Sequence, residues 1–123
     1  MRTFRHWPGR YFDLWTFEIK PTWSVNVTGI YEAAAHSRCA TQSFCAYHVE
    51  DIDGIPEDEI GRLVGEAQRL GVGLIFFTDP ADYSTWDLRV MPVRREPDPS
   101  LLEEFIATQV SDYGQDQLLR WSK

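Results

Sequence analysis

The sequence predicts an α/β (α+β) fold in which helices flank a mixed β-sheet, and three observations predict it. Residues 71–77 (GVGLIFF) form a nearly continuous apolar run, which is typical of a strand covered on both faces. A helical pattern separates this run from the strand pattern of residues 43–49, and two strands joined through a helix are expected to be parallel. Two opening strand patterns, residues 3–7 and 10–20, predict an antiparallel hairpin around a turn at residues 7–10.

The first half of the chain contains a long strand and a helix. Residues 10–20 (RYFDLWTFEIK) are rich in aromatic and branched side chains, and Pro21 ends this strand. Residues 27–40 are predicted to be helical, because they include three consecutive alanines and because Asn26 or Thr28 can cap them.

The second half begins with a helix and continues with an edge strand. Residues 57–70 place apolar side chains at helical spacing, and Gly71 is a natural stop. Residues 86–93 predict a further strand at an edge of the sheet, since Pro92 has no N–H to donate to a neighbour.

The C-terminal region predicts two more helical segments. Asp98 can cap a helix that has Pro99 at its first position. Residues 115–121 predict a short last helix. The length of 123 residues suits a single domain over residues 1–123.

Charge and cysteine content limit the function and the compartment. The net charge of −7 argues against non-specific coating of nucleic acid, which needs many Lys and Arg side chains. It is compatible with a metal-dependent enzyme, which needs carboxylates. Cys39 and Cys45 are expected to be free thiols of a cytoplasmic protein. The longest apolar run is too short for a bilayer, so no membrane partner is expected.

The tripeptide Glu18-Ile19-Lys20 carries the chemistry. Strand alternation places Glu18 and Lys20 on one face and Ile19 on the other. The carboxylate can then bind a divalent ion, and the ammonium group can orient an attacking water or help to deprotonate it. The alternative is a solvated surface ion pair, which is the common outcome for an arbitrary ExK.

The order of elements around this tripeptide resembles a known superfamily. A strand ending in ExK, a turn, an alanine-rich helix and a further strand form the core order of the PD-(D/E)xK nucleases. The segment FDLWTFEIK…YEAAAHSRCATQSFCAYHV…GVGLIFF is similar to uncharacterised bacterial nuclease-like domains of this group. The resemblance covers roughly residues 8–106 and implies a restriction-endonuclease-like core. It also implies hydrolysis of nucleic acid, DNA in the first place, by an endonuclease that uses Mg²⁺ or Mn²⁺.

The resemblance also implies roles for individual residues. Glu18 would be the metal-binding acid, the carbonyl of Ile19 a further metal ligand, and Lys20 the residue that serves the nucleophilic water.

Three further residues are expected to support Lys20 or to contact the substrate. Glu32 and His36 share one helix face, because they are four residues apart, and Arg38 follows them. The short connection 21–26 returns the chain across the strand end. Glu18 and Lys20 are therefore expected to project toward Glu32 and His36.

The sequence departs from the superfamily at its second acid. The nearest candidate for a metal-binding aspartate is Asp13, whose parity is opposite to that of Glu18, so only a β-bulge would bring it round. The N-terminal helix of the superfamily is also missing. We therefore expect either a C-terminal fragment of a longer protein, completed by an N-terminal domain or a homodimer, or a degenerate copy. The alternatives are an inactive nuclease-like module that binds nucleic acid or a protein, and an unrelated α/β interaction domain.

Overall fold

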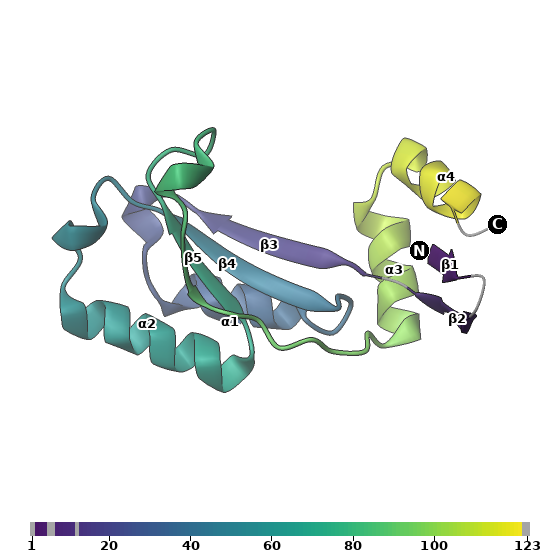
Figure 1. The fold of residues 1–123 in the computed structure, drawn as a ribbon, viewed down its shortest axis with the longest axis horizontal. Helices are drawn as coiled ribbons and strands as arrows, with labels where there is room; N and C mark the ends of the chain where they lie inside the picture. The colour runs from purple at the N-terminus through teal and green to yellow at the C-terminus, as the bar shows by residue number, and fades with distance from the viewer. Residues whose placement is uncertain (1, 5–6, 12, 122–123) are drawn as a thin grey trace.

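A four-stranded mixed sheet forms the centre of the molecule. The structure, a computed structural model, describes the backbone of residues 2–4, 7–11 and 13–121 and the side chains of residues 13–120. The strand order is β3 (Trp15–Lys20), β4 (Gln42–His48), β5 (Gly73–Phe77) and β6 (Asp87–Val90). The first three strands are parallel (Figure 1). β6 runs antiparallel to β5.

Two helices pack on one face of this sheet. α1 (Val27–His36) connects β3 to β4, and α2 (Glu57–Leu70) connects β4 to β5 (Figure 1). The predicted mixed sheet, the parallel crossover and the edge position of the last strand are confirmed. α2 has the predicted bounds, and Gly71 ends it with a left-handed φ of 70°.

The opening hairpin is the main correction. β1 (Arg2–Phe4) and β2 (Trp7–Tyr11) pair antiparallel, but they form a separate two-stranded sheet, so residues 7–10 lie in a strand and not in a turn. The strand predicted for residues 10–20 is divided, because β3 begins only at Trp15 and pairs in parallel with β4.

The hydrogen bonds of Leu14 explain where β3 begins. Its N–H donates to the Thr41 side chain at 2.9 Å, and its carbonyl accepts from the Thr41 N–H at 2.9 Å. These bonds fix the backbone just before β3, and they join segments 27 residues apart in sequence.

The first helix is shorter than predicted. α1 ends at His36 instead of continuing to residue 40. The hydroxyl of Ser37 donates to the carbonyl of Ala34 at 2.6 Å, and the Cys39 N–H donates to the carbonyl of His36 at 3.2 Å. These bonds satisfy two of the last carbonyls and turn the chain toward β4. At the other end, Asn26 caps α1 as predicted.

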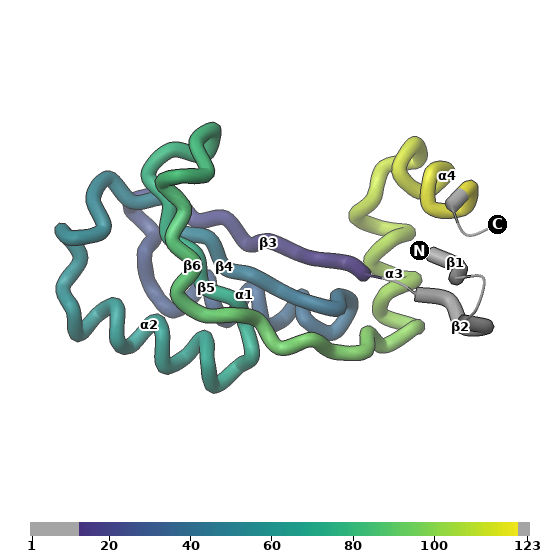
Figure 2. Tube along the Cα trace, viewed as in Figure 1, coloured from purple at the N-terminus to yellow at the C-terminus, as the bar shows by residue number. Residues whose placement is uncertain are grey.

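Two C-terminal helices lie apart from the sheet (Figures 1 and 2). α3 (Pro99–Gln109) begins as predicted, with the Asp98 carboxylate accepting from the N–H groups of Ser100 and Leu101. α4 (Asp112–Trp121) begins three residues earlier than expected. No helix of the described residues is long and apolar enough to span a bilayer.

The two faces of the sheet differ in their cover. The face under α1 and α2 belongs to the main core, in which the large buried side chains are Tyr47, Phe76, Ile30, Leu63 and Leu74. The opposite face has a second, smaller cluster, which consists of Phe44, Ala46, Ile75 and Phe77, with Trp86 packed against it. No helix residue of the described chain belongs to that second cluster.

Candidate functional site

The end of β3 presents two opposite charges on the helix-covered face of the sheet. Exposure alternates along β3, so that Glu18 and Lys20 are partly buried while Phe17 and Ile19 are exposed on the other face. The aligned residues of β4 are Cys45 beside Glu18 and Tyr47 beside Lys20. Both of these neighbours are fully buried. The ion pair is therefore built on the edge of the core and is not a freely solvated pair.

Gly29 lets α1 approach this strand end closely. A Cβ atom at residue 29 would lie 2.9 Å from Cγ of Lys20, 2.9 Å from Sγ of Cys45 and 3.0 Å from the hydroxyl of Tyr47. The Tyr47 hydroxyl also donates to the backbone carbonyl of Asn26, the residue that caps α1. Neither role has a local sequence signal, since both depend on contacts between distant segments.

Four side chains converge at this point. Nζ of Lys20 lies 3.5 Å from Oε1 of Glu18 and 2.5 Å from Oε2 of Glu32. Nε2 of His36 lies 3.3 Å from Oε2 of Glu18. The structure thus brings together the strand pair and the helix pair that the sequence spacing predicted to meet. Their chemical roles stay predictions.

The electrostatics of this ExK cluster (Glu18, Lys20, Glu32 and His36) keep Lys20 protonated. The hydrogen bond with Glu32 raises the pKa of Lys20 and lowers the pKa of Glu32. Burial raises the pKa of Cys45 behind them to about 11, so this thiol stays neutral near pH 7. Two carboxylates and one ammonium group leave the cluster with one net negative charge whenever His36 is neutral.

Asp13 is not part of this cluster. It lies before the first residue of β3, whereas Glu18 is near the last. Its Oδ1 accepts from the hydroxyl of Thr41 at 2.6 Å and lies 2.9 Å from Nη1 of Arg94. Sequence reasoning missed both partners, because they are 28 and 81 residues away. The structure does not bring Asp13 to Glu18, and its role as a metal ligand has no support from this geometry.

Arg38 and Ile19 have different positions. Arg38 follows the end of α1, and its carbonyl accepts from the Asp98 N–H at 2.9 Å. It lines a surface pocket with Arg95 and Glu96, so the structure does not place it in the ExK cluster. Ile19 directs its side chain to the opposite face of β3, and only its backbone is available on the side of Glu18.

The residues of the cluster suit a divalent ion in kind. Carboxylate and carbonyl oxygens are the ligands that Mg²⁺ prefers, and the net negative charge attracts a cation. Among the described residues, however, no three His, Cys, Asp or Glu side chains are arranged to hold a metal ion. Glu18 with the Ile19 carbonyl would therefore bind Mg²⁺ weakly and leave it most of its water.

Comparisons with family models, curated proteins and solved structures found no significant match to this chain. The likeness to PD-(D/E)xK nucleases therefore depends on the residues quoted above. Membership of that superfamily remains a proposal.

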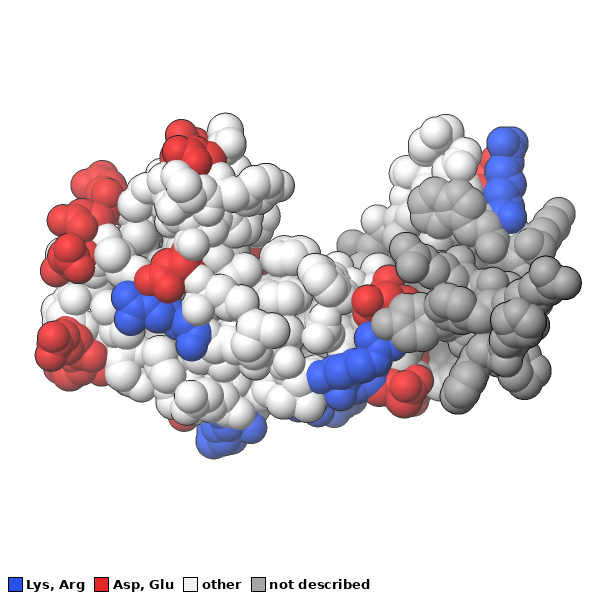
Figure 3. Space-filling view, viewed as in Figure 1, with Lys and Arg blue, Asp and Glu red and all other residues white. Residues whose placement is uncertain are grey.

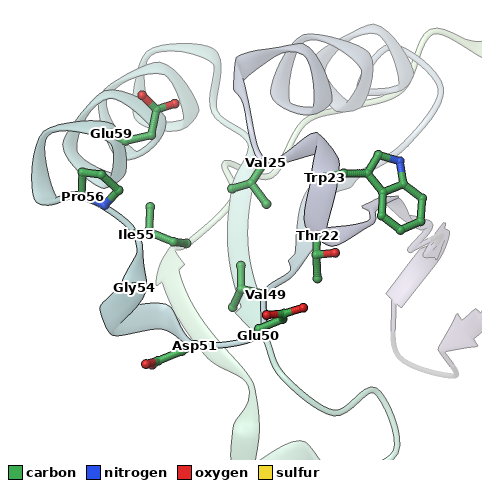
Figure 4. A pocket seen from close by; sticks show the side chains of 10 residues that line it. All are labelled: Thr22, Trp23, Val25, Val49, Glu50, Asp51, Gly54, Ile55, Pro56 and Glu59. Atoms are coloured by element: carbon green, nitrogen blue, oxygen red, sulfur yellow. The ribbon is translucent and has the colours of Figure 1, made fainter.

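A surface depression separate from the ExK cluster lies at the carboxyl ends of β3 and β4. It has a volume of about 570 Å³ and an apolar floor of Val25, Val49 and Ile55 (Figure 4). Asp51 and Glu59 point outward in different directions, and the Trp23 indole turns away from the floor (Figure 4). This depression offers no constellation comparable to the ExK cluster.

The bonds of Asp13 predict a structural role that can be measured. The hydrogen bond from Thr41 lowers the pKa of Asp13 below its usual 3.8. The ionised Asp13 carboxylate therefore stabilises the fold above pH 3.8, and this stabilisation is lost as the pH falls through the lowered pKa. We expect Asp13→Ala to lower the free energy of unfolding by about 1–2 kcal/mol at pH 7, and by less at pH 3. Urea unfolding at both pH values checks this.

The matched control is Asp87→Ala, since Asp87 pairs with Arg89 at 2.7 Å on an exposed surface. That change is expected to cost less than about 0.5 kcal/mol. An equal cost for both variants at pH 7 would contradict a special role for the Asp13–Thr41 bond.

Proposed function

We propose that the chain carries a metal-dependent nuclease site whose centre is Glu18 and Lys20. One observation carries the proposal. Lys20 at the end of β3 lies between Glu18 and Glu32, while His36, one turn further along α1, contacts Glu18. A solvated surface pair has no such neighbours. Here Glu32 and His36 of α1 contact the pair, and Gly29 allows α1 to approach it closely.

The charge of the ExK cluster supports a divalent ion as a requirement. A phosphodiester is an anion, and a cluster with one net negative charge repels it. Lys20 is already engaged by two carboxylates, so it is not free to attract phosphate by itself. Binding of Mg²⁺ or Mn²⁺ reverses the sign of the local charge. We therefore expect metal to bind before the substrate.

The residues of the chain then have distinct roles. Glu18 holds the ion, and Lys20 orients the attacking water and stays protonated because of Glu32. Glu32 and His36 are positioning residues, which hold Lys20 and Glu18 respectively. When bound, the ion polarises the phosphoryl oxygen and lowers the pKa of water. Glu18 is the one carboxylate of the cluster to which we assign the ion, so cleavage is expected to be weak.

The second candidate is an inactive nuclease-like module. The position of Asp13 favours this module, because Thr41 and Arg94 bind the Asp13 carboxylate. Asp13 was the only nearby acid that the sequence offered as a second metal ligand. Such a module would bind nucleic acid or a protein without cutting it. In that case, binding to nucleic acid would weaken on Lys20→Ala, and no metal-dependent cleavage would appear.

A cleavage assay separates the two candidates. Single- and double-stranded DNA and RNA are incubated with Mg²⁺, Mn²⁺ or EDTA and the wild type, Glu18→Gln or Lys20→Met. We expect slow cleavage that requires the metal and falls at least about a hundredfold in both variants, because each removes a group acting at the reacting phosphate.

The matched controls are Glu66→Gln and Arg69→Met, which break an ion pair of 2.7 Å on α2, outside the ExK cluster. Both control variants should cleave nucleic acid at the rate of the wild type. Cleavage that survives Glu18→Gln and Lys20→Met would remove these residues from the active site, and absence of any metal-dependent cleavage would leave the inactive module as the function.

A further inference from the structure

The depression at the carboxyl ends of β3 and β4 has an apolar floor and an exposed tryptophan at its edge. Val49 on the floor is buried, whereas Val25 and Ile55 are half-buried, so apolar surface remains open to a ligand (Figure 4). The Trp23 side chain is 84% exposed, although proteins usually bury most of a tryptophan. Open sheets with parallel strands commonly bind ligands at this end of the strands.

The rim of this depression is acidic. Glu50, Asp51 and Glu59 line it, and none of the lining residues that the structure describes is Lys, Arg or His. These carboxylates belong to residues 50–59, of which six are acidic and none is basic. Figure 3 shows acidic side chains gathered over the connection from β4 to α2 and the start of that helix. Within the described part of the chain, no basic side chain forms an ion pair with any of the three rim carboxylates.

Local structure accounts for only part of this negative charge. Acidic residues in the first turn of a helix interact favourably with the helix dipole, which explains Glu59 at the start of α2. Asp51 caps the short turn after β4, because its carboxylate accepts from the Asp53 N–H at 3.0 Å. Glu50 is exposed between β4 and this turn, and it neither caps the turn nor belongs to the first turn of α2. Its charge therefore has no local structural explanation.

We propose that the depression binds a basic segment of a partner protein. An apolar side chain of that segment covers Val25 and Ile55, and Lys or Arg side chains beside it pair with the rim carboxylates. Trp23 contacts the same segment outside the floor, where its ring can pack against the stem of a Lys or accept a cation–π contact from an Arg. The inference does not rest on the nuclease proposal.

The charge of the depression decides between the possible occupants. The rim repels nucleic acid and acidic peptides, and the net charge of −7 disfavours a second copy of the chain. A small cation on the floor would leave Trp23 uncovered, because the indole turns away from the floor (Figure 4). A polypeptide that crosses the rim reaches both the floor and the indole.

Selection from a random peptide library displayed on phage tests the proposal. The target is the full wild-type chain, and phage that bind the double variant Trp23→Ala, Glu50→Lys are removed beforehand. We expect the selected peptides to carry several Lys or Arg residues next to an aliphatic or aromatic residue. Selected peptides that are acidic, or apolar without basic residues, would contradict the proposal, and so would a library from which no peptide is selected.

Fluorescence anisotropy of the strongest selected peptide, labelled with fluorescein, measures the contribution of each residue. Trp23→Ala and Glu50→Lys should each raise Kd at least about tenfold, because the first removes the exposed ring and the second reverses a rim charge. Tyr83→Ala and Glu103→Lys are the matched controls, since both residues are exposed and lie outside the depression, and each should change Kd less than about threefold. Far-UV circular dichroism shows that each variant is folded before it is compared.

Two further results would overturn the proposal. If Glu103→Lys weakened binding as much as Glu50→Lys, the peptide would respond to the overall charge of the chain and not to the depression. If spermidine bound the wild type more tightly than the peptide and Trp23→Ala left that binding unchanged, the occupant would be a small cation. We expect instead that the peptide binds more tightly than spermidine, and that raising NaCl from about 50 to 500 mM weakens its binding severalfold.

Discussion

Tyr47→Ala is expected to lower the free energy of unfolding by about 3–5 kcal/mol. Tyr47 is fully buried between α1 and β5, and its ring stacks on Phe76 with centroids 5.8 Å apart. The substitution leaves a cavity and removes the donor to the Asn26 carbonyl at the start of α1. Urea unfolding at pH 7 measures the loss.

Tyr47→Phe separates the two contributions. It keeps the ring and loses only the hydroxyl, so it should cost about 1–3 kcal/mol. Tyr113→Ala is the control, because Tyr113 is 76% exposed and should cost less than about 0.5 kcal/mol. If Tyr47→Ala cost no more than Tyr113→Ala, α1 would not pack on β4 as described. The geometry of the ExK cluster, which depends on that packing, would then be contradicted as well.

Lys20→Ala is expected to change metal binding and cleavage in opposite directions. Removing the ammonium leaves Glu18 and Glu32 without the cation that lies 3.5 Å and 2.5 Å from them. The pKa of Glu32 should rise toward its ordinary value, because the Lys20 hydrogen bond is the main cause of its lowering. The site gains one net negative charge, so Mn²⁺ should bind roughly fivefold more tightly or better, judged by Coulomb attraction at these distances.

Cleavage by the same variant should disappear, since nothing then orients the attacking water. Calorimetric titration with Mn²⁺ and the cleavage assay measure the two effects in one preparation. Arg69→Ala is the matched control, because Arg69 pairs with Glu66 on α2, outside the ExK cluster. Weaker Mn²⁺ binding after Lys20→Ala would contradict a cation site at Glu18.

Local signals predicted the elements that position the ExK cluster. Parity along β3 and the four-residue spacing of Glu32 and His36 are properties of a single strand and a single helix, so the sequence alone could place these side chains on facing surfaces. The start of β3 could not be predicted in this way. Residues 10–20 have strand propensity throughout, and the division depends on hydrogen bonds between Leu14 and Thr41, which are distant in sequence.

The same limit applies to the second acid. Parity already placed Asp13 on the opposite side from Glu18, but its partners Thr41 and Arg94 come from two other segments of the chain. The separate pairing of β1 with β2 also depends on tertiary structure, since an opening hairpin next to a strand normally extends the same sheet. Long-range contacts therefore decide whether Asp13 is available to Glu18 as a second metal-binding acid.

The central claim is that the ExK cluster binds a divalent cation, and Mn²⁺-induced broadening of backbone amide NMR signals tests it most directly. The chain offers a strong competitor, because acidic side chains gather at the connection from β4 to α2 and at the start of that helix (Figure 3). Substoichiometric Mn²⁺ should broaden residues 18–20 and 32–36 first, and Glu18→Gln should abolish this. Broadening confined to residues 50–59, and unchanged by Glu18→Gln, would contradict the claim.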